Sequence, residues 1–330
     1  MKHFVTKPFA APLVTTALFL LVVTTGCPSA LADDKPIQRQ SSTFSYTTFD
    51  VELPLVQVRM NNKLTGTFLL DTGANTSVVT DKVANKLGLT PQARYKDGKP
   101  YTVGGQAVKG ITLTPMQIGP VNLAQVAVSV VPERSLSLFS TPLDGIIGTN
   151  ILSVFSVFFD FPRHQITLWY PAGLSAEEIN NAGFDHASVL SMTSPLDTGD
   201  YLVPVQLRQG GRSVQEGLLL DTGGGVTVIS KKSARQLGLD PASHTTQPSF
   251  RGSFVADRAR LTALRLGDIE VEDKLVEYPS DDKSLFPSIL GMDTLSGYRV
   301  LLDFPSKKMY IQAVVPSLNI KPSGAKTAAP

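Results

Sequence analysis

Short apolar runs that end at polar turn residues fill the chain after residue 45 and predict a mostly β protein. One of these runs, FLLDTGA at 68–74, recurs as LLLDTGG at 218–224, an offset of 150 residues. Upstream of each copy, apolar and polar positions alternate, at 56–59 and again at 205–208, and an Asn-Asn or Gly-Gly pair follows. Alternation that ends at such a pair predicts a β-hairpin in each copy.

The repeat continues beyond the two Asp-Thr-Gly triplets. The hydroxyl residues Thr80 and Ser230 each precede apolar positions spaced three to four apart, and a Leu-Gly-Leu segment with a later Pro follows at 87–91 and 237–241. A hydroxyl residue at the start and a glycine after the end are typical of helix caps. Each copy therefore predicts a short helix here.

Two more matched segments lie toward the end of each copy. The segment IIG at 146–148 matches ILG at 289–291, and DFP at 160–162 matches DFP at 303–305. Each Asp-Phe-Pro lies between two apolar runs, which predicts a surface hairpin with its Asp as a structural turn residue.

The repeat divides the chain into two copies of one β-rich unit, which we name lobe one and lobe two. The connector between them is polar, and its Ser-Ala-Glu-Glu segment predicts a helix start at Ser175. In chain order the expected segments are a signal peptide at 1–32, a linker at 33–44, lobe one at 45–171, the connector at 172–198, lobe two at 199–316 and a disordered tail at 317–330.

The first 32 residues have the features of an export signal. A short basic start is followed by an uncharged apolar run at 9–23, which is shorter than a membrane span. Cleavage after the Ala-x-Ala that ends at Ala32 is one interpretation. The other is a lipoprotein signal at 1–26, which would leave Cys27 as a lipidated N-terminus. Both predict an exported chain: periplasmic, lipid-anchored to the outer membrane through Cys27, or secreted.

Composition narrows the possible partners. The net charge is +2 and charged residues make up 18 % of the chain, so a nucleic-acid partner is not expected. A single Cys and four His without shared ligand spacing predict neither a disulfide framework nor a metal site, and no cofactor is expected. After the signal no run reaches ~20 apolar residues, so membrane contact is expected only through the signal or a lipid anchor.

The two repeated triplets place a carboxylate at the end of an apolar strand, followed by a glycine that permits a tight turn. A twofold arrangement of the lobes would bring Asp71 and Asp221 face to face. Two carboxyl groups in contact share a proton, so that one acts as a base and the other as an acid. A third Asp-Thr-Gly, at 197–199, lacks the preceding apolar run and the following helix, and it predicts only a turn.

Two segments carry a resemblance to a known family. The segments LLDTGA at 69–74 and IIGTNIL at 146–152 closely resemble the two signature segments of retroviral aspartic proteases, and DGIIG at 144–148 also resembles the version in the pepsin family. The chain as a whole resembles a bacterial two-lobed aspartic protease. The resemblance implies a retropepsin-like closed β-barrel in each lobe and a peptide-binding cleft between the lobes.

The resemblance also implies roles for particular residues. Asp71 and Asp221 would be the catalytic pair of an aspartic endopeptidase that cleaves a peptide or unfolded protein by direct attack of water. Supporting roles would fall to Thr72 and Thr222, which would hydrogen-bond across the lobes, and to Gly73 and Gly223, which would offer N–H groups to the carboxylates. Gly104, Gly105 and Gly252 are candidates for the tips of flap hairpins, and the alternative is that they belong to ordinary glycine-containing hairpins. Since one chain supplies both halves, a monomer is expected.

The chain also departs from the family patterns. Thr149 and Met292 stand where retroviral subunits carry an Arg that supports dimer contacts, which fits two lobes in one chain. Three consecutive glycines, 223–225, make the second loop more flexible than the first. The alternative to an enzyme is therefore a catalytically silent peptide- or protein-binding module of the exported envelope that keeps the same fold. Two intact Asp-Thr-Gly loops favour the enzyme, and the glycine-rich loop favours the silent module.

Overall fold

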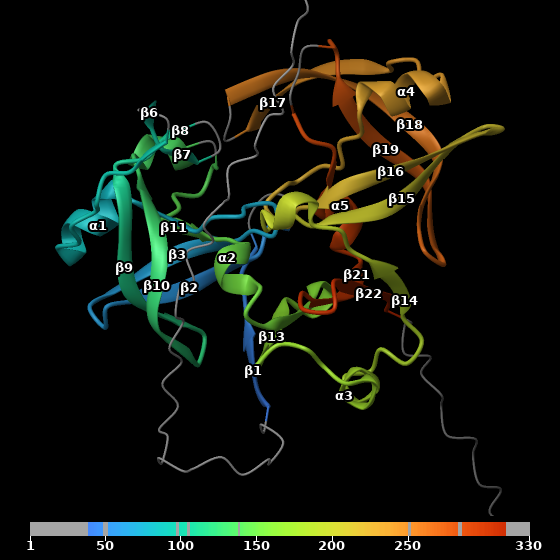
Figure 1. Cartoon of the computed structure of the whole chain (residues 1–330). Coiled ribbons are helices and arrows are strands. Elements are labelled where there is room, and N and C mark those ends of the chain that lie inside the picture. The colour runs from blue at the N-terminus through green and yellow to red at the C-terminus, as the bar shows by residue number, and fades with distance from the viewer. Residues whose placement is uncertain are drawn as a thin grey trace, which may run out of the picture.

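The structure, a computed structural model, describes residues 39–48, 52–96, 99–103, 106–137, 139–249, 252–282 and 286–314. These residues form the mostly β protein that the sequence predicts. Figure 1 shows three parts: lobe one with β9 and β10, lobe two with β15 to β19, and a third sheet between and below them. The expected signal peptide with Cys27, and the expected tail, lie outside the described residues.

Lobe one is built on a closed barrel of six strands in the order β10-β4-β11-β3-β2-β9. The inward side chains of β2 alternate with exposed Gln57 and Arg59, which is the pattern read from the sequence. Asn61 and Asn62 turn the chain into β3 with positive φ values of 48° and 52°. The strands are β2 (Leu55–Met60), β3 (Leu64–Leu70), β4 (Val78–Thr80), β9 (Gly110–Ile118), β10 (Val121–Val131) and β11 (Gly145–Ile147).

Lobe two repeats this arrangement, but it has no strand equivalent to β4 and carries β17 as an additional edge strand. Its sheet runs in the order β17-β18-β15-β16-β20, with β19 paired to β18. In place of a strand equivalent to β4, the single residue Val228 bridges Glu277 of β19 and Ile289 of β20. Lobe two thus repeats the strand order around the barrel of lobe one, but isolated bridges at Val228 take the place of one strand. The strands are β15 (Leu202–Gln209), β16 (Arg212–Leu220), β17 (Ser243–Ser249), β18 (Gly252–Leu266), β19 (Ile269–Pro279) and β20 (Ile289–Leu290).

The two predicted helices are confirmed as α1 (Asp81–Leu87) and α4 (Lys231–Leu237). The hydroxyl of Thr80 accepts a hydrogen bond from the N–H of Val83, and that of Ser230 accepts one from the N–H of Ser233. Each helix ends at a glycine in the left-handed conformation, Gly88 or Gly238, with φ of 66° and 67°.

A third sheet joins the lobes, and we call it the shared sheet. Its central pair, β12 with β21, brings one strand from each lobe into register, with Val157 opposite Leu302. The order is β1 (Gln40–Ser45), β13 (Gln165–Tyr170), β12 (Ser156–Asp160), β21 (Tyr298–Asp303), β22 (Lys308–Ala313) and β14 (Ser188–Ser191). The sequence did not predict this sheet.

Two strands of the shared sheet lie in the segments that the sequence predicts as a linker and a connector. The segment 33–44, expected as a linker, ends in strand β1, which pairs with β13 along its full length. The connector 172–198 contains the helix predicted at Ser175, α3 (Ala176–Asn181), with a complete capping box. It also contains β14, which forms the opposite edge of the shared sheet.

The Asp-Phe-Pro hairpins are present, but their carboxylates do not lie at the surface as expected. Asp160 is 4 % exposed and Asp303 is 1 % exposed. The carboxylate of Asp160 lies near the guanidinium groups of Arg163 and Arg299. Asp303 accepts hydrogen bonds from the hydroxyl of Ser156, from the hydroxyl of Ser306 and from the N–H of Gly173. The burial arises because both hairpins belong to the centre of the shared sheet.

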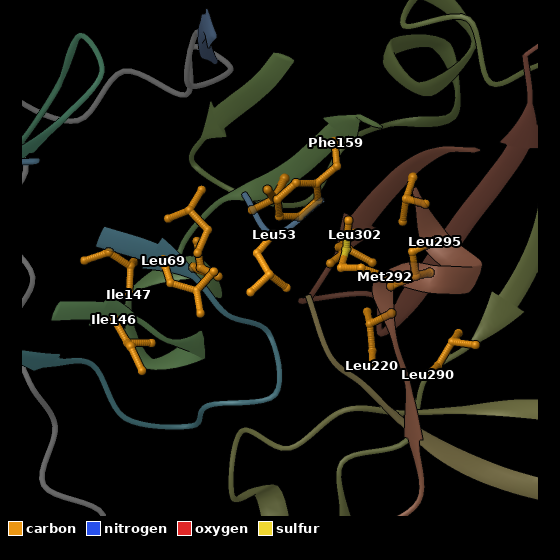
Figure 2. Close-up of a cluster of buried hydrophobic side chains, with 14 of the residues drawn as sticks. Leu53, Leu69, Ile146, Ile147, Phe159, Leu220, Leu290, Met292, Leu295 and Leu302 are labelled. Atoms are coloured by element: carbon orange, nitrogen blue, oxygen red, sulfur yellow. The ribbon is translucent and has the colours of Figure 1, made fainter. Parts of the chain in front are cut away.

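One continuous apolar core runs through both lobes. Leu69 and Ile147 of lobe one, Phe159 and Leu302 of the shared sheet, and Leu220 of lobe two belong to the same buried cluster (Figure 2). On the other side of the shared sheet, α3 and its neighbours cover a smaller cluster that includes Phe184 and Tyr310. The lobes are therefore held together by a common core and a common sheet.

The remaining elements are short hairpins and single helical turns. No helix in the described part of the chain is long and apolar enough to span a bilayer. These elements are the strands β5 (Tyr95–Lys96), β6 (Lys99–Pro100), β7 (Thr102–Val103) and β8 (Gln106–Ala107), the helices α2 (Thr149–Leu152) and α5 (Met292–Leu295), and the 3-10 turns at Glu133–Leu136, Phe161–Arg163 and Pro195–Asp197.

Candidate active site

The carboxyl groups of Asp71 and Asp221 lie at equivalent places in the two lobes. Asp71 follows β3 directly, and its N–H donates to the carbonyl of Ile147 in β11, at 2.9 Å. Asp221 follows β16, and its N–H donates to the carbonyl of Leu290 in β20, at 3.1 Å. The segments that begin at these two residues are named the Asp71 loop (71–77) and the Asp221 loop (221–227). Each loop is therefore held beside a matched segment of its own lobe, 146–148 in lobe one and 289–291 in lobe two.

The threonines after the two carboxylates bond across the lobes, as the resemblance implied. The hydroxyl of Thr72 donates to the carbonyl of Leu220 at 2.8 Å and accepts from the N–H of Thr222 at 3.1 Å. The hydroxyl of Thr222 donates to the carbonyl of Leu70 at 2.7 Å and accepts from the N–H of Thr72 at 3.1 Å. Both threonines are buried. This exchange holds the two loops in a symmetric register.

The glycines of the triplets allow the loops to approach each other closely. The N–H of Gly73 donates to Asp71 Oδ1 at 2.8 Å, and the N–H of Gly223 donates to Asp221 Oδ1 at 2.9 Å. A Cβ added at Gly73 would lie 2.5 Å from the carboxyl of Asp221, and one added at Gly223 would lie 2.5 Å from the carboxyl of Asp71. Only glycine leaves room for the opposite carboxyl group.

The two carboxyl groups meet between the loops, and the pKa of each is raised. Burial is the main cause for both. For Asp221 the negative charge of Asp71 adds to it, and the pKa rises well above the usual range of an aspartate. On Asp71 the N–H groups of Gly73, Ala74 and Gly223 oppose the rise, because they stabilise the charged form. The pair is arranged to hold one proton between two carboxyl groups.

The matched segments at 146–148 and 289–291 lie directly behind the Asp71 loop and the Asp221 loop. A Cβ at Gly148 would lie 2.4 Å from the carbonyl oxygen of Ala74, and one at Gly291 would lie 2.4 Å from that of Val226. The N–H of Thr149 donates to Ala74, and that of Met292 donates to Gly224, both at 2.8 Å. Close backbone packing of this kind explains why glycine precedes α2 and α5.

The predicted flap positions lie on hairpins. Gly104 and Gly105 are outside the described residues, but Val103 and Gln106 on either side of them are paired partners in β7 and β8. Gly252 starts β18 and pairs with Ser249 of β17, so the second hairpin has the same short span.

The two flap-candidate hairpins are not equivalent in shape. Strand β18 runs without a break from Gly252 into the sheet of lobe two. In lobe one the corresponding strand is interrupted before Gly110, whose φ is 152° and whose added Cβ would lie 2.5 Å from the carbonyl oxygen of Gln92.

The third Asp-Thr-Gly, at 197–199, lies in a turn, as predicted. Asp197 is exposed and pairs with Lys307 at 2.9 Å. Gly199 does have a role between the lobes, because its carbonyl accepts a hydrogen bond from the hydroxyl of Thr149 at 2.7 Å. Thr149 therefore makes a contact between lobes at the position where retroviral subunits carry Arg. The described residues contain no group of His, Cys, Asp and Glu side chains that could hold a metal ion.

Sequence reasoning missed one charged pair near the site, buried Lys274 with partly exposed Asp293. A signal was present, because Lys274 is in the same alternating phase as Val276 and Tyr278, which are buried in β19. A lysine in an apolar phase indicates a buried partner for its charge.

Two repeated β lobes that each contribute one carboxyl group on a glycine-bearing loop define an aspartic protease fold. Two family profiles match the chain in tandem. The profile described as "gag-polyprotein putative aspartyl protease" matches residues 56–154, and the profile described as "Aspartyl protease" matches residues 203–294. No curated protein matches the chain. The chain therefore carries two aspartyl protease domains in tandem, consistent with a two-lobed retropepsin-like protease.

Proposed function

We propose that the protein is an aspartic endopeptidase that hydrolyses peptide bonds with a water molecule activated between Asp71 and Asp221. One observation carries the proposal: the carboxyl group from each lobe lies against the glycine of the opposite Asp-Thr-Gly loop, so that the two groups meet, and the pKa of each is raised. A binding module would not need two carboxyl groups in this costly arrangement, whereas acid–base catalysis does.

The environments of the two carboxyl groups suggest how the roles are divided. Asp71 Oδ1 accepts hydrogen bonds from two N–H groups, those of Gly73 and Ala74, whereas Asp221 Oδ1 accepts one from Gly223, so we propose that Asp71 is the ionised partner and Asp221 the protonated one. Ionised Asp71 takes a proton from water as the water oxygen attacks the carbonyl carbon of the peptide bond. Protonated Asp221 donates its proton to the carbonyl oxygen, which gives an uncharged tetrahedral diol.

The collapse of this intermediate completes the reaction. The proton on Asp71 passes to the amide nitrogen as the carbon–nitrogen bond breaks, and Asp221 takes back a proton from a diol hydroxyl. The products are a carboxylic acid and an amine, and the pair returns to its starting state. The reaction proposed here requires two carboxyl groups and one water molecule.

The surroundings of the pair support a polymeric peptide substrate. The hairpins β7–β8 and β17–β18 are proposed as flaps that cover an extended chain and exclude water. Phe254, near the tip of the second hairpin, stacks on Phe286 with ring centroids 4.2 Å apart.

We further propose that the protein acts as a monomer on peptides or unfolded proteins outside the cytoplasm, as its first 32 residues suggest.

The proposal is tested with the purified protein and a mixed peptide library at pH values from about 3 to 8. We expect internal cleavage by the parent chain and none by Asp71→Asn or Asp221→Asn, with mass spectrometry as the readout. Asp197→Asn is the matched control, since it changes the third Asp-Thr-Gly and should cleave normally. Cleavage that survives the first two changes would overturn the site. No cleavage by the parent at any pH would favour the silent binding module.

A further inference from the structure

The Asp221 loop contains more glycine than its counterpart. Gly223, Gly224 and Gly225 stand where the Asp71 loop has Gly73, Ala74 and Asn75. Two additional glycines widen the range of backbone conformations available to the loop. A catalytic carboxyl group needs a fixed position, so an unusually mobile sequence needs contacts that hold it.

Helix α5 supplies these contacts along the loop. The N–H groups of Met292 and Asp293 donate to the carbonyls of Gly224 and Gly225, at 2.8 and 3.2 Å. The carboxylate of Asp293 accepts a hydrogen bond from the hydroxyl of buried Thr227, at 2.7 Å. Asp293 therefore contacts the glycine run through its backbone N–H and the end of the loop through its carboxylate.

Lys274 of β19 fixes that side chain from behind. Its ammonium group is 2.9 Å from Asp293 Oδ2 and donates to the carbonyl oxygen of the same residue at 2.8 Å. Only 8 % of the Lys274 side chain is exposed. A buried ammonium group is costly unless it is paired, so these two bonds to one residue bind Lys274 and Asp293 into a unit.

Lobe one performs the same task without a charge. Asn150 stands at the position of Asp293, and its Oδ1 accepts hydrogen bonds from the N–H and the hydroxyl of Ser77, both at 2.7 Å. Its Nδ2 donates to the carbonyl of Ala127 at 3.1 Å. A neutral amide thus anchors the loop that has one glycine, and an ion pair anchors the loop that has three.

We propose that Lys274 is a positioning residue for Asp221: its ammonium group neutralises and orients Asp293, which in turn fixes the glycine-rich Asp221 loop. The inference rests on the proposed peptidase function, because it assigns Lys274 a part in that reaction. Lys274 does not reach the reacting atoms, so its effect passes through Asp293 and the loop.

The test compares single and double variants by steady-state kinetics on a peptide that the parent cleaves. Lys274→Met leaves the Asp293 carboxylate without its cation, and we expect kcat to fall about tenfold with KM within about twofold. Lys274→Met with Asp293→Asn recreates the neutral arrangement of lobe one. We expect this double variant to recover kcat to within about threefold of the parent.

The exposed pair of Arg208 and Glu270, in the same lobe, provides the matched control. Arg208→Met removes a cation from the surface and should leave kcat and KM unchanged. Parent-like kcat in folded Lys274→Met overturns the proposal. A double variant that is no more active than Lys274→Met also overturns it, because the cation would then not act through Asp293.

Thermal unfolding shows whether each variant folds. If Lys274→Met does not fold, Asp293→Asn takes its place, since it leaves the Lys274 ammonium facing an amide. We expect about a tenfold loss of kcat in Asp293→Asn and recovery in the double variant. Parent-like kcat in Asp293→Asn overturns the proposal. A parent chain that cleaves nothing removes the proposed function, and this inference with it, before any Lys274 variant is measured.

Discussion

Thr72 and Thr222 exchange hydrogen bonds across the boundary between the lobes, each hydroxyl accepting from the N–H of the other residue at 3.1 Å. Each hydroxyl also donates to the carbonyl that precedes the opposite carboxylate. Four buried hydrogen bonds thus connect the two loops. The relationship predicts that removal of either hydroxyl weakens the whole protein as well as the site.

Thr222→Val removes one hydroxyl and keeps the shape of the side chain. Because it leaves the Leu70 carbonyl and the Thr72 N–H without their buried partner, we expect the free energy of unfolding to fall by about 2 kcal/mol. Urea denaturation followed by circular dichroism measures this change. Thr198→Val, in the exposed third triplet, is the control and should cost no more than about 0.5 kcal/mol. Equal losses in the two variants would contradict the structural role.

The raised pKa of Asp221 predicts how stability depends on pH. A carboxyl whose pKa is higher in the folded state contributes its full stability below the unfolded pKa and loses it as pH rises through the folded pKa. Asp221→Asn cannot ionise, so it avoids this loss. We therefore expect Asp221→Asn to be more stable than the parent at pH 7, with a gap that narrows toward pH 3. Unfolding temperatures at several pH values measure the gap, and a gap that does not vary with pH would refute the raised pKa.

The close approach of the loops predicts a steric effect at the glycines. In Gly73→Ala the new methyl group would lie 2.5 Å from the carboxyl of Asp221, and the loops must separate. We expect kcat/KM to fall at least about 100-fold. Gly297→Ala is the control, since an added Cβ there meets nothing within 4 Å, and it should keep activity within a few-fold. A fully active Gly73→Ala would show that the carboxyl groups do not meet as described.

The burial of Asp303 predicts that the shared sheet depends on this carboxylate. Asp303→Ala leaves the hydroxyl of Ser156 without its acceptor and removes one of the two acceptors of the Gly173 N–H, the other being Ser156 Oγ, at a site that is 1 % exposed. We expect a loss of about 3 kcal/mol in the free energy of unfolding. Asp185→Ala, at an exposed position, should change it little. A small effect of Asp303→Ala in urea denaturation would show that the hydrogen bonds at this position can be lost without cost.

The internal repeat accounts for what the sequence could predict. Matched flanks around Asp71 and Asp221 imply matched surroundings, so the hairpins, the capped helices and the pairing of the two carboxyl groups followed from one pattern. The glycine after each Asp-Thr predicted that the two loops approach each other closely, because no other residue suits that position. Whether these residues catalyse peptide cleavage stays a prediction until the variants are measured.

The shared sheet could not be predicted in the same way. Strands β12 and β21 are both apolar and are far apart in the sequence, and such strands carry no mark of which partner they pair with. The assignment of the Asp-Phe-Pro carboxylates to the surface was wrong for this reason, since their burial depends on that pairing. Lys274 was missed because the repeat directs attention to matched residues, and its position has no charged counterpart in lobe one.

The unequal anchors behind the two loops show what a single chain allows. In a symmetric homodimer a change in one subunit appears in the other, so an ion pair behind one loop would stand behind both. Here Asn150 and Asp293 occupy equivalent places but are encoded separately, and each can change without the other. Two separately encoded halves therefore allow the surroundings of Asp71 and Asp221 to change independently, which identical subunits cannot achieve by mutation.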